Sequence, residues 1–152
     1  MNLDITKYFS ADHDRLDTIL EVSEKAMTDR NGKALNYFHT FRNGLKKHIE
    51  WEEDILFPLF EKKFNIFNMG PTQVMRLEHQ KIVNIMTQIE TVLSEQQVDS
   101  DLFLELKKTL QTHNLKEENI LYPAIDEQLT KNEIADIFSM MAELSEIDGD
   151  SA

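Results

Sequence analysis

The amino-acid sequence predicts an all-α fold: an up-down-up-down antiparallel four-helix bundle followed by a short fifth helix at the C-terminus. Three observations support this prediction. Glycine and proline are scarce, with 4 and 3 copies, so few positions interrupt a helix. The alternation of polar and apolar residues that is typical of strands is missing. Apolar residues instead recur at alternating steps of three and four, and the short loops between long helices favour antiparallel neighbours.

Short segments rich in turn-forming residues divide the helices from one another. These segments lie at 29–32, 65–70 and 95–100. Pro71 follows the second segment, and proline favours the first position of a helix because no helical partner is needed for its missing N–H. The four bundle helices are therefore predicted at 5–28, 33–63, 71–94 and 101–128.

The fifth helix is predicted at 131–146. Thr130 and Glu133 have the spacing of a capping box, which marks its start, and residues 147–152 are expected to fray. A chain of 152 residues fits one domain with a substantial core. The prediction is a single domain over 1–152, with the bundle at about 5–128.

The inward faces of the second and fourth helices follow from the steps of three and four. In the second helix the predicted inward residues are Phe38, Phe41, Leu45, His48, Glu52, Ile55 and Leu59. In the fourth helix they are Phe103, Leu106, Leu110, His113, Glu117, Ile120 and Ala124. Each stripe is apolar except for one histidine and one glutamate.

These two helices carry two copies of one motif. HIEWEEDILFP begins at His48, and HNLKEENILYP begins 65 positions later at His113, so that Glu52 corresponds to Glu117. A histidine and a glutamate four positions apart lie one above the other on a helix, with Cβ atoms about 6 Å apart. Each copy therefore places one imidazole and one carboxylate where they can bind one ion or two adjacent ions.

Another histidine precedes each copy at nearly the same distance. His13 stands 35 positions before His48, and His79 stands 34 positions before His113. Both belong to the predicted inward stripes of the first and third helices. Because the two halves repeat imidazoles and carboxylates, and not merely leucines, we expect one site built symmetrically from both halves.

Buried carboxylates need a compensating charge. A lone histidine on an apolar face is more often a satisfied core residue, but an unpaired carboxylate would face a desolvation cost of several kcal/mol, more than the roughly 1 kcal/mol that a hydrogen bond returns. Two cations about 3.5 to 4 Å apart that share bridging carboxylates would compensate directly. The predicted metal ligands are His13, His48, Glu52, His79, His113 and Glu117.

A glutamate and a proline follow each predicted glutamate ligand closely in the sequence. Glu53 and Glu118 lie about 100° further round the helix, and are expected to contact solvent or to orient an imidazole through a hydrogen bond. Either can also replace its neighbour as a ligand. Pro58 and Pro123 are expected to kink both long helices just past the metal level.

Three other residues are expected to stay outside the metal chemistry. His39 stands nine positions before His48, about half a turn round the helix and some 13 Å along it, and is predicted not to bind metal. Phe57 and Tyr122 are interpreted as packing residues.

The composition excludes several classes of function. The formal net charge is -12, with 16 Lys and Arg against 28 Asp and Glu, so nucleic acid and anionic membrane surfaces are poor partners. The chain has no cysteine, which leaves imidazole and oxygen as metal ligands. Neither a signal peptide nor a stretch of ~20 apolar residues is found, so a cytoplasmic location is expected.

The chain resembles the hemerythrin-like, or HHE cation-binding, domain over nearly its whole length. The matching segments are DHDRLD around His13, LEHQKI around His79 and the two motif copies. The resemblance implies two Fe ions in a four-helix bundle, bridged by Glu52, Glu117 and an oxo or hydroxo group. The implied histidine pairs are His13 with His48 on one iron and His79 with His113 on the other.

The chain departs from the oxygen-carrying hemerythrins at two points. Those carriers have a further histidine ligand one turn after the histidine of the third helix, where this chain has Val83. The departure implies an open position on both irons. The carriers also place their last carboxylate five positions after the histidine, which would select Glu118, but the repeat of His48 and Glu52 favours Glu117.

Two functions from different classes follow from the resemblance. The first is a diiron protein that binds or senses O2, NO, peroxide or iron itself, with a small diatomic ligand or peroxide as its partner. The alternative is a diiron redox enzyme with peroxidase, ferroxidase or iron-centre repair-type activity, although the relatives tied to repair carry a cysteine-containing domain that is not found here. Four imidazoles and two carboxylates also suit Mn or Zn.

Overall fold

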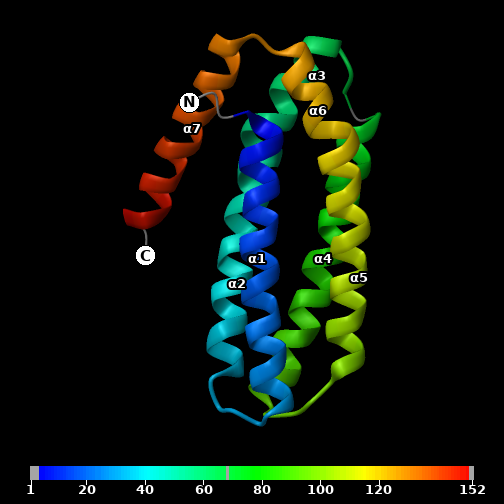
Figure 1. Cartoon of the computed structure of the whole chain (residues 1–152), viewed down its shortest axis with the longest axis vertical. Coiled ribbons are helices and arrows are strands. Elements are labelled where there is room, and N and C mark those ends of the chain that lie inside the picture. The colour runs from blue at the N-terminus through cyan, green and yellow to red at the C-terminus, as the bar shows by residue number, and fades with distance from the viewer. Residues whose placement is uncertain (1–3, 68, 151–152) are drawn as a thin grey trace.

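The computed structural model describes residues 4–67 and 69–150, which form helices with no strand among them (Figure 1). The helices are α1 (Ile5–Thr28), α2 (Ala34–Glu50), η1 (Trp51–Leu56), α3 (Phe57–Phe64), α4 (Pro71–Ser94), α5 (Ser100–Lys116), η2 (Glu117–Leu121), α6 (Tyr122–Gln128) and α7 (Lys131–Asp150). The label η marks a π-helical turn, whose backbone hydrogen bonds span five residues instead of four. The prediction of an all-helical chain is confirmed.

Four long rods lie side by side in Figure 1. They are formed by α1, by α2 with η1 and α3, by α4, and by α5 with η2 and α6. α1 packs against α2 and α4 packs against α5, while contacts of α2 with α4 and of α1 with α5 join the two pairs. The α1–α2 and α4–α5 connections lie at the same end of the rods, and the connections after α3 and α6 lie at the other.

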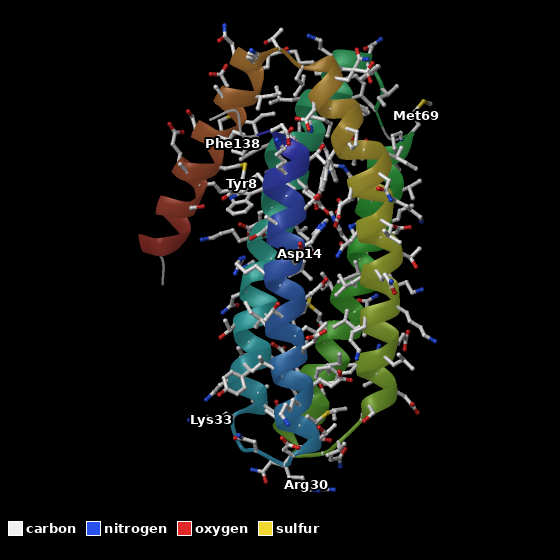
Figure 2. All side chains as sticks on the ribbon, in the orientation of Figure 1. Tyr8, Asp14, Arg30, Lys33, Met69 and Phe138 are labelled. Carbon is white, nitrogen blue, oxygen red and sulfur yellow. The ribbon has the colours of Figure 1, made fainter. Side chains whose placement is uncertain are left out.

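The C-terminal α7 turns back beside the α1 and α2 pair (Figure 1). Its predicted capping box is confirmed, because the Thr130 N–H donates to Glu133 at 2.8 Å and the Glu133 N–H donates to the Thr130 hydroxyl at 3.1 Å. Figure 2 shows Tyr8 beside Phe138, and their ring centroids lie 5.2 Å apart. The helix continues to Asp150, so the predicted end at 146 was too early; residues 151 and 152 of the expected frayed tail lie outside the described residues.

The buried apolar residues form two clusters along the rods. One cluster includes Leu16, Phe41, Met86 and Leu106, and the other includes Phe9, Trp51, Met75 and Leu121. On α1 the clusters are separated by His13, which stands between Phe9 and Leu16. A polar level thus divides the core, and no helix among residues 4–67 and 69–150 is long and apolar enough to cross a membrane.

Both π-helical turns lie just before a proline. The N–H of Phe57 donates to the Glu52 carbonyl and the N–H of Tyr122 donates to the Glu117 carbonyl, each five residues back. The proline that follows each of these residues lacks an N–H and clashes with the carbonyl four positions before it, which favours a wider turn there. The sequence Phe-Pro or Tyr-Pro therefore favours a wider, π-helical turn at the position of each predicted glutamate ligand.

The wider turns correct part of the predicted inward face. Ile120 was expected to point inward but is 64% exposed, while Leu121 and Tyr122 are buried. Leu59 and Ala124 are only partly buried for the same reason, since one extra residue in each π turn shifts the inward stripe by about one position. The residues predicted at 33–63 and 101–128 thus form three consecutive helical elements each, not one regular helix.

One side chain fixes α6 against the start of α1. The carboxylate of Asp126 accepts hydrogen bonds from the N–H groups of Ile5 and Thr6, at 2.8 and 2.9 Å, and from the Thr6 hydroxyl at 2.6 Å. These N–H groups have no partner within their own helix, so the carboxylate caps α1 from a distant part of the sequence. The contact holds Tyr122, one turn before Asp126, at a defined place beside α1.

Candidate metal centre

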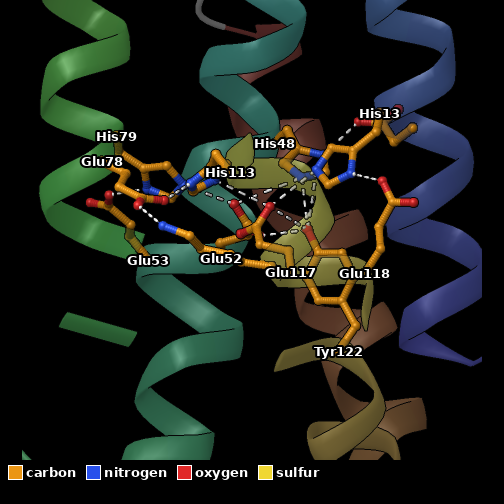
Figure 3. A network of polar contacts seen from close by, with 12 residues as sticks. His13, His48, Glu52, Glu53, Glu78, His79, His113, Glu117, Glu118 and Tyr122 are labelled. Carbon is orange, nitrogen blue, oxygen red and sulfur yellow. Dashed lines mark hydrogen bonds and ion pairs between the residues drawn. The ribbon is translucent and has the colours of Figure 1, made fainter. Parts of the chain in front are cut away.

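All six predicted ligand residues meet at the polar level between the two apolar clusters (Figure 3). The elements α1, α2, α4 and α5 each supply one histidine, and each π turn supplies one glutamate. None of the six is more than 3% exposed to solvent. They are His13, His48, Glu52, His79, His113 and Glu117.

Each glutamate lies between two imidazoles from different helices. Glu52 Oε1 is 3.7 Å from His48 Nε2 and 3.1 Å from His79 Nε2. Glu117 Oε1 is 3.1 Å from His13 Nε2 and 3.2 Å from His113 Nε2. The two carboxylates therefore occupy the centre, and each connects the two halves of the repeat.

The outer nitrogens of two imidazoles contact the glutamates that follow the central pair. His79 Nδ1 lies 2.6 Å from Glu53 Oε2, and His13 Nδ1 lies 2.7 Å from Glu118 Oε2. Both carboxylates are about one third exposed, at 30% and 29%. Of the alternatives predicted for Glu53 and Glu118, the structure places them as partners that orient an imidazole.

The other two imidazoles have partners that sequence reasoning missed. His48 Nδ1 lies 2.9 Å from Asp12 Oδ2, and His113 Nδ1 lies 2.8 Å from Glu78 Oε1. Asp12 directly precedes His13 and Glu78 directly precedes His79, so each acid binds an imidazole of the next helix. The repeated pair of an acid followed by a histidine was a signal available in the sequence.

The four outer carboxylates set the direction of the four inner nitrogens. A ring whose Nδ1–H donates to a carboxylate keeps its other nitrogen free of the proton when the imidazole is neutral, and presents a lone pair there. In each case that nitrogen is Nε2, which faces Glu52 or Glu117. When the imidazoles are neutral, four nitrogen lone pairs therefore face the two buried carboxylates.

The charges of the centre shift the protonation of its members. Burial lowers the pKa of His13 and His79, but hydrogen bonds and the fields of Glu117 and Glu52 outweigh burial and raise these pKa values to about 9 and about 10. The pKa of His113 is raised for the same reasons. Burial and the neighbouring Glu117 raise the pKa of Glu52. For Glu117, hydrogen bonds from Glu52 and two imidazoles overcome burial and hold the pKa well below its usual value.

Tyr122 belongs to this centre, although the sequence analysis interpreted it as a packing residue. Its hydroxyl donates to Glu52 Oε2 at 2.7 Å and to Glu117 Oε1 at 3.0 Å. The oxygen also lies 3.2 Å from His48 Nε2 and 3.3 Å from His13 Nε2. Burial and the charges of Glu117 and Glu52 raise the pKa of Tyr122 well above its usual value, so the hydroxyl keeps its proton when only these groups surround it.

Several atoms of the centre lack a hydrogen-bond partner and could instead bind a cation. Glu52 Oε1, His79 Nε2 and Glu117 Oε2 are buried and have no hydrogen-bond partner. Glu52 Oε1 and His79 Nε2 lie 3.1 Å apart, yet the two atoms are not aligned for a hydrogen bond. Buried groups without partners are costly, and a shared cation would satisfy all three.

The atoms gather into two overlapping sets that can hold metal ions. One set has ligand atoms from Glu52, His79, His113 and Glu117, all within 4.8 Å of one another, and the other has His13 and His48 with the same Glu117. His39 lies outside both sets; it is half exposed, and its Nε2 is 3.4 Å from Glu90 on α4. The arrangement can bind cations at two adjacent positions that share a carboxylate.

Comparison with known proteins bears on the same residues. The chain matches the family described as "Hemerythrin HHE cation binding domain" over residues 4–147. No match was found among curated proteins or among solved structures. The match spans both motif copies and every residue of the buried cluster. The chain therefore belongs to the hemerythrin HHE cation-binding domain family.

Proposed function

We propose that the protein binds two iron ions in this centre and uses them to bind or sense O2, NO, peroxide or iron itself. In the proposed site His13 and His48 hold one ion, His79 and His113 hold the other, and Glu52 and Glu117 bridge them. The bundle that carries these residues is proposed to have the up-down-up-down order.

One observation carries the proposal. All four imidazoles have Nδ1 bound to an outer carboxylate while Nε2 faces a buried glutamate, and this is the arrangement that prepares histidines as metal ligands. Imidazole and carboxylate suit iron, and they suit manganese and zinc as well. Iron is proposed because it supplies, when bound, the redox chemistry that O2, NO and peroxide require.

The size of the ligand follows from the burial of the centre. The six proposed metal ligands are at most 3% exposed, so a bulky substrate does not reach them. A cavity of about 280 Å³ between α4 and α5 is lined by residues that include Glu78 and His113. A diatomic molecule or peroxide is small enough for this cavity, and is the partner that we propose.

A redox enzyme is the second candidate, and Tyr122 favours it. Its hydroxyl lies within hydrogen-bond distance of both central carboxylates and can donate a hydrogen bond to peroxide inside the buried centre. Cleavage of the O–O bond of peroxide benefits from such a donor, whereas reversible binding of an intact diatomic molecule does not require it.

Metal analysis and gas binding test the proposal. Protein loaded with iron(II) without oxygen is expected to hold two iron ions per chain and to give a defined, reversible absorption change with O2 or NO. His39→Ala, outside the centre, is the control and should keep both ions. Rapid irreversible oxidation without an adduct would contradict binding or sensing, and turnover of peroxide with an electron donor, faster than with free iron, would favour the enzyme. A protein that binds zinc alone would exclude both.

A further inference from the structure

The polar contacts of the four imidazoles correspond between the two halves of the centre, with one exception. Asp12 with His48 corresponds to Glu78 with His113, and the pairs formed by Glu53 and Glu118 correspond in the same way. The exception comes after the π turns, where HIEWEEDILFP has a phenylalanine and HNLKEENILYP has a tyrosine. At this position the two halves therefore differ by a single oxygen atom.

The two aromatic rings occupy equivalent places beside the imidazoles. Phe57 is stacked on His79, with ring centroids 6.1 Å apart and an interplanar angle of 8°. Tyr122 lies beside His13, with centroids 5.8 Å apart and an angle of 29°. Both rings are fully buried. The hydroxyl of Tyr122 thus faces the His13 and His48 half, and the matching place in the other half holds only carbon and hydrogen.

The hydroxyl oxygen has the spacing of a metal ligand relative to its neighbours. In an octahedral site with bonds of about 2.1 Å, one ligand atom has four neighbouring ligand atoms at about 3.0 Å. The Tyr122 oxygen lies 2.7 and 3.0 Å from the glutamate oxygens, and 3.2 and 3.3 Å from His48 and His13 Nε2. These four distances are close to those expected between a ligand oxygen and its neighbours in one coordination shell.

The other half lacks such a donor. Its atoms include two of those without partners, Glu52 Oε1 and His79 Nε2. His113 itself lines the 280 Å³ cavity between α4 and α5. Val83, one turn after His79, offers no ligand atom and is 38% exposed. This half therefore has a coordination position to fill, and one of its histidines borders a cavity that a small molecule can enter.

We propose that the Tyr122 oxygen is a ligand of the metal position formed by His13 and His48, and that added small anions bind at the His79 and His113 position. The proposal rests on the dinuclear function proposed above. Coordination replaces the O–H bond of Tyr122 by an oxygen–metal bond and releases the proton to solvent. The two metal positions are then chemically different although the chain is a repeat, and only one of them is open.

The ferric protein provides a direct test, because phenolate bound to iron(III) absorbs visible light through charge transfer and enhances tyrosine ring modes in resonance Raman spectra. Iron-loaded, oxidised wild type should show both signals and bind one azide per chain. Tyr122→Phe should lose both signals while retaining iron. Phe57→Tyr combined with Tyr122→Phe moves the hydroxyl to the other half and should restore them.

The outcomes separate this inference from the proposed function. If the wild type binds two iron ions but shows no tyrosinate signals, the inference is overturned and the proposed function is not. If the signals persist in Tyr122→Phe, they come from Tyr8 or Tyr37, and the inference is again overturned. Two azide ions per wild-type chain would refute the single open position. A wild type that binds no iron would instead overturn the proposed function. The wild-type spectrum decides the question even if the variant does not fold.

Discussion

Removing the outer carboxylate of one histidine should weaken the metal centre without touching a proposed ligand. Glu53 Oε2 lies 2.6 Å from His79 Nδ1, the shortest of the four outer contacts. In Glu53→Ala the ring of His79 loses the partner that fixes its rotation and makes Nε2 a stronger donor. Loss of such a partner lowers metal affinity about 10- to 100-fold, which corresponds to about 1.4 to 2.7 kcal/mol.

The position of Glu53 sets where in this range the effect falls. Its side chain is 30% exposed, so water can replace part of the lost hydrogen bond, and we expect a decrease near the lower limit, about tenfold. Glu53→Gln, which keeps an oxygen acceptor but removes the charge, should cost less than Glu53→Ala.

Competition with a chelator of known affinity measures the change. Asp54→Ala is the matched control, since it removes an exposed carboxylate from the same π turn. Equal metal affinity in Glu53→Ala and wild type would refute the argument that the outer carboxylate prepares the imidazole. An equal loss in Asp54→Ala would show that the effect is one of net charge.

Five further predictions concern the metal centre, the start of α1 and position 83. Glu52→Ala should reduce bound metal from two ions per chain to one or none, because a shared carboxylate is lost, and metal analysis with two ions still bound would exclude its bridging role. His13 and His79 have pKa values raised to about 9 and about 10, so both carry protons at pH 7 that a metal must displace. Metal affinity should therefore rise with pH up to about 10, and titration calorimetry in two buffers should detect proton release. Without metal, the stability that these raised pKa values provide is complete below about pH 6.5 and is lost as pH rises through 9 to 10, which thermal unfolding at several pH values can follow. Asp126→Ala should destabilise the fold by about 1 to 2 kcal/mol, because the first N–H groups of α1 lose their cap, and an unchanged urea midpoint would refute this. Val83→His should slow autoxidation of the iron(II) protein if it supplies a further ligand, as measured by stopped-flow absorption, and unchanged kinetics would contradict that explanation.

The regular parts of the helices could be predicted from the sequence because their signals are local. The bounds of α1 and α4 agree with the predicted 5–28 and 71–94. The start of α7 was visible in Thr130 and Glu133, which form the predicted capping box. The inward position of the four histidines could be predicted as well, because a regular helix keeps residues three and four positions apart on one face.

The π turns could not be read from the same pattern, and two errors follow from them. In an α-helix Tyr122 would lie about 140° round from Glu117, five positions earlier, and would point away from the centre. The wider turn of η2 brings both residues to the same face and moves Ile120 out to solvent. Asp12 and Glu78 were missed for another reason, because their contacts cross between helices and depend on how the helices pack.

The polar level between the two apolar clusters also bears on how the molecule holds together. Leu16 and its neighbours form one apolar cluster, and Phe9 and its neighbours form the other. The histidines and glutamates of the centre lie between the two clusters. Apolar contacts hold each cluster together. The level between the clusters consists of polar and charged groups, and some of their buried atoms have no hydrogen-bond partner. Cations bound between the two clusters would link them, so we expect removal of metal to lower the cooperativity of thermal unfolding, which calorimetry with and without metal measures.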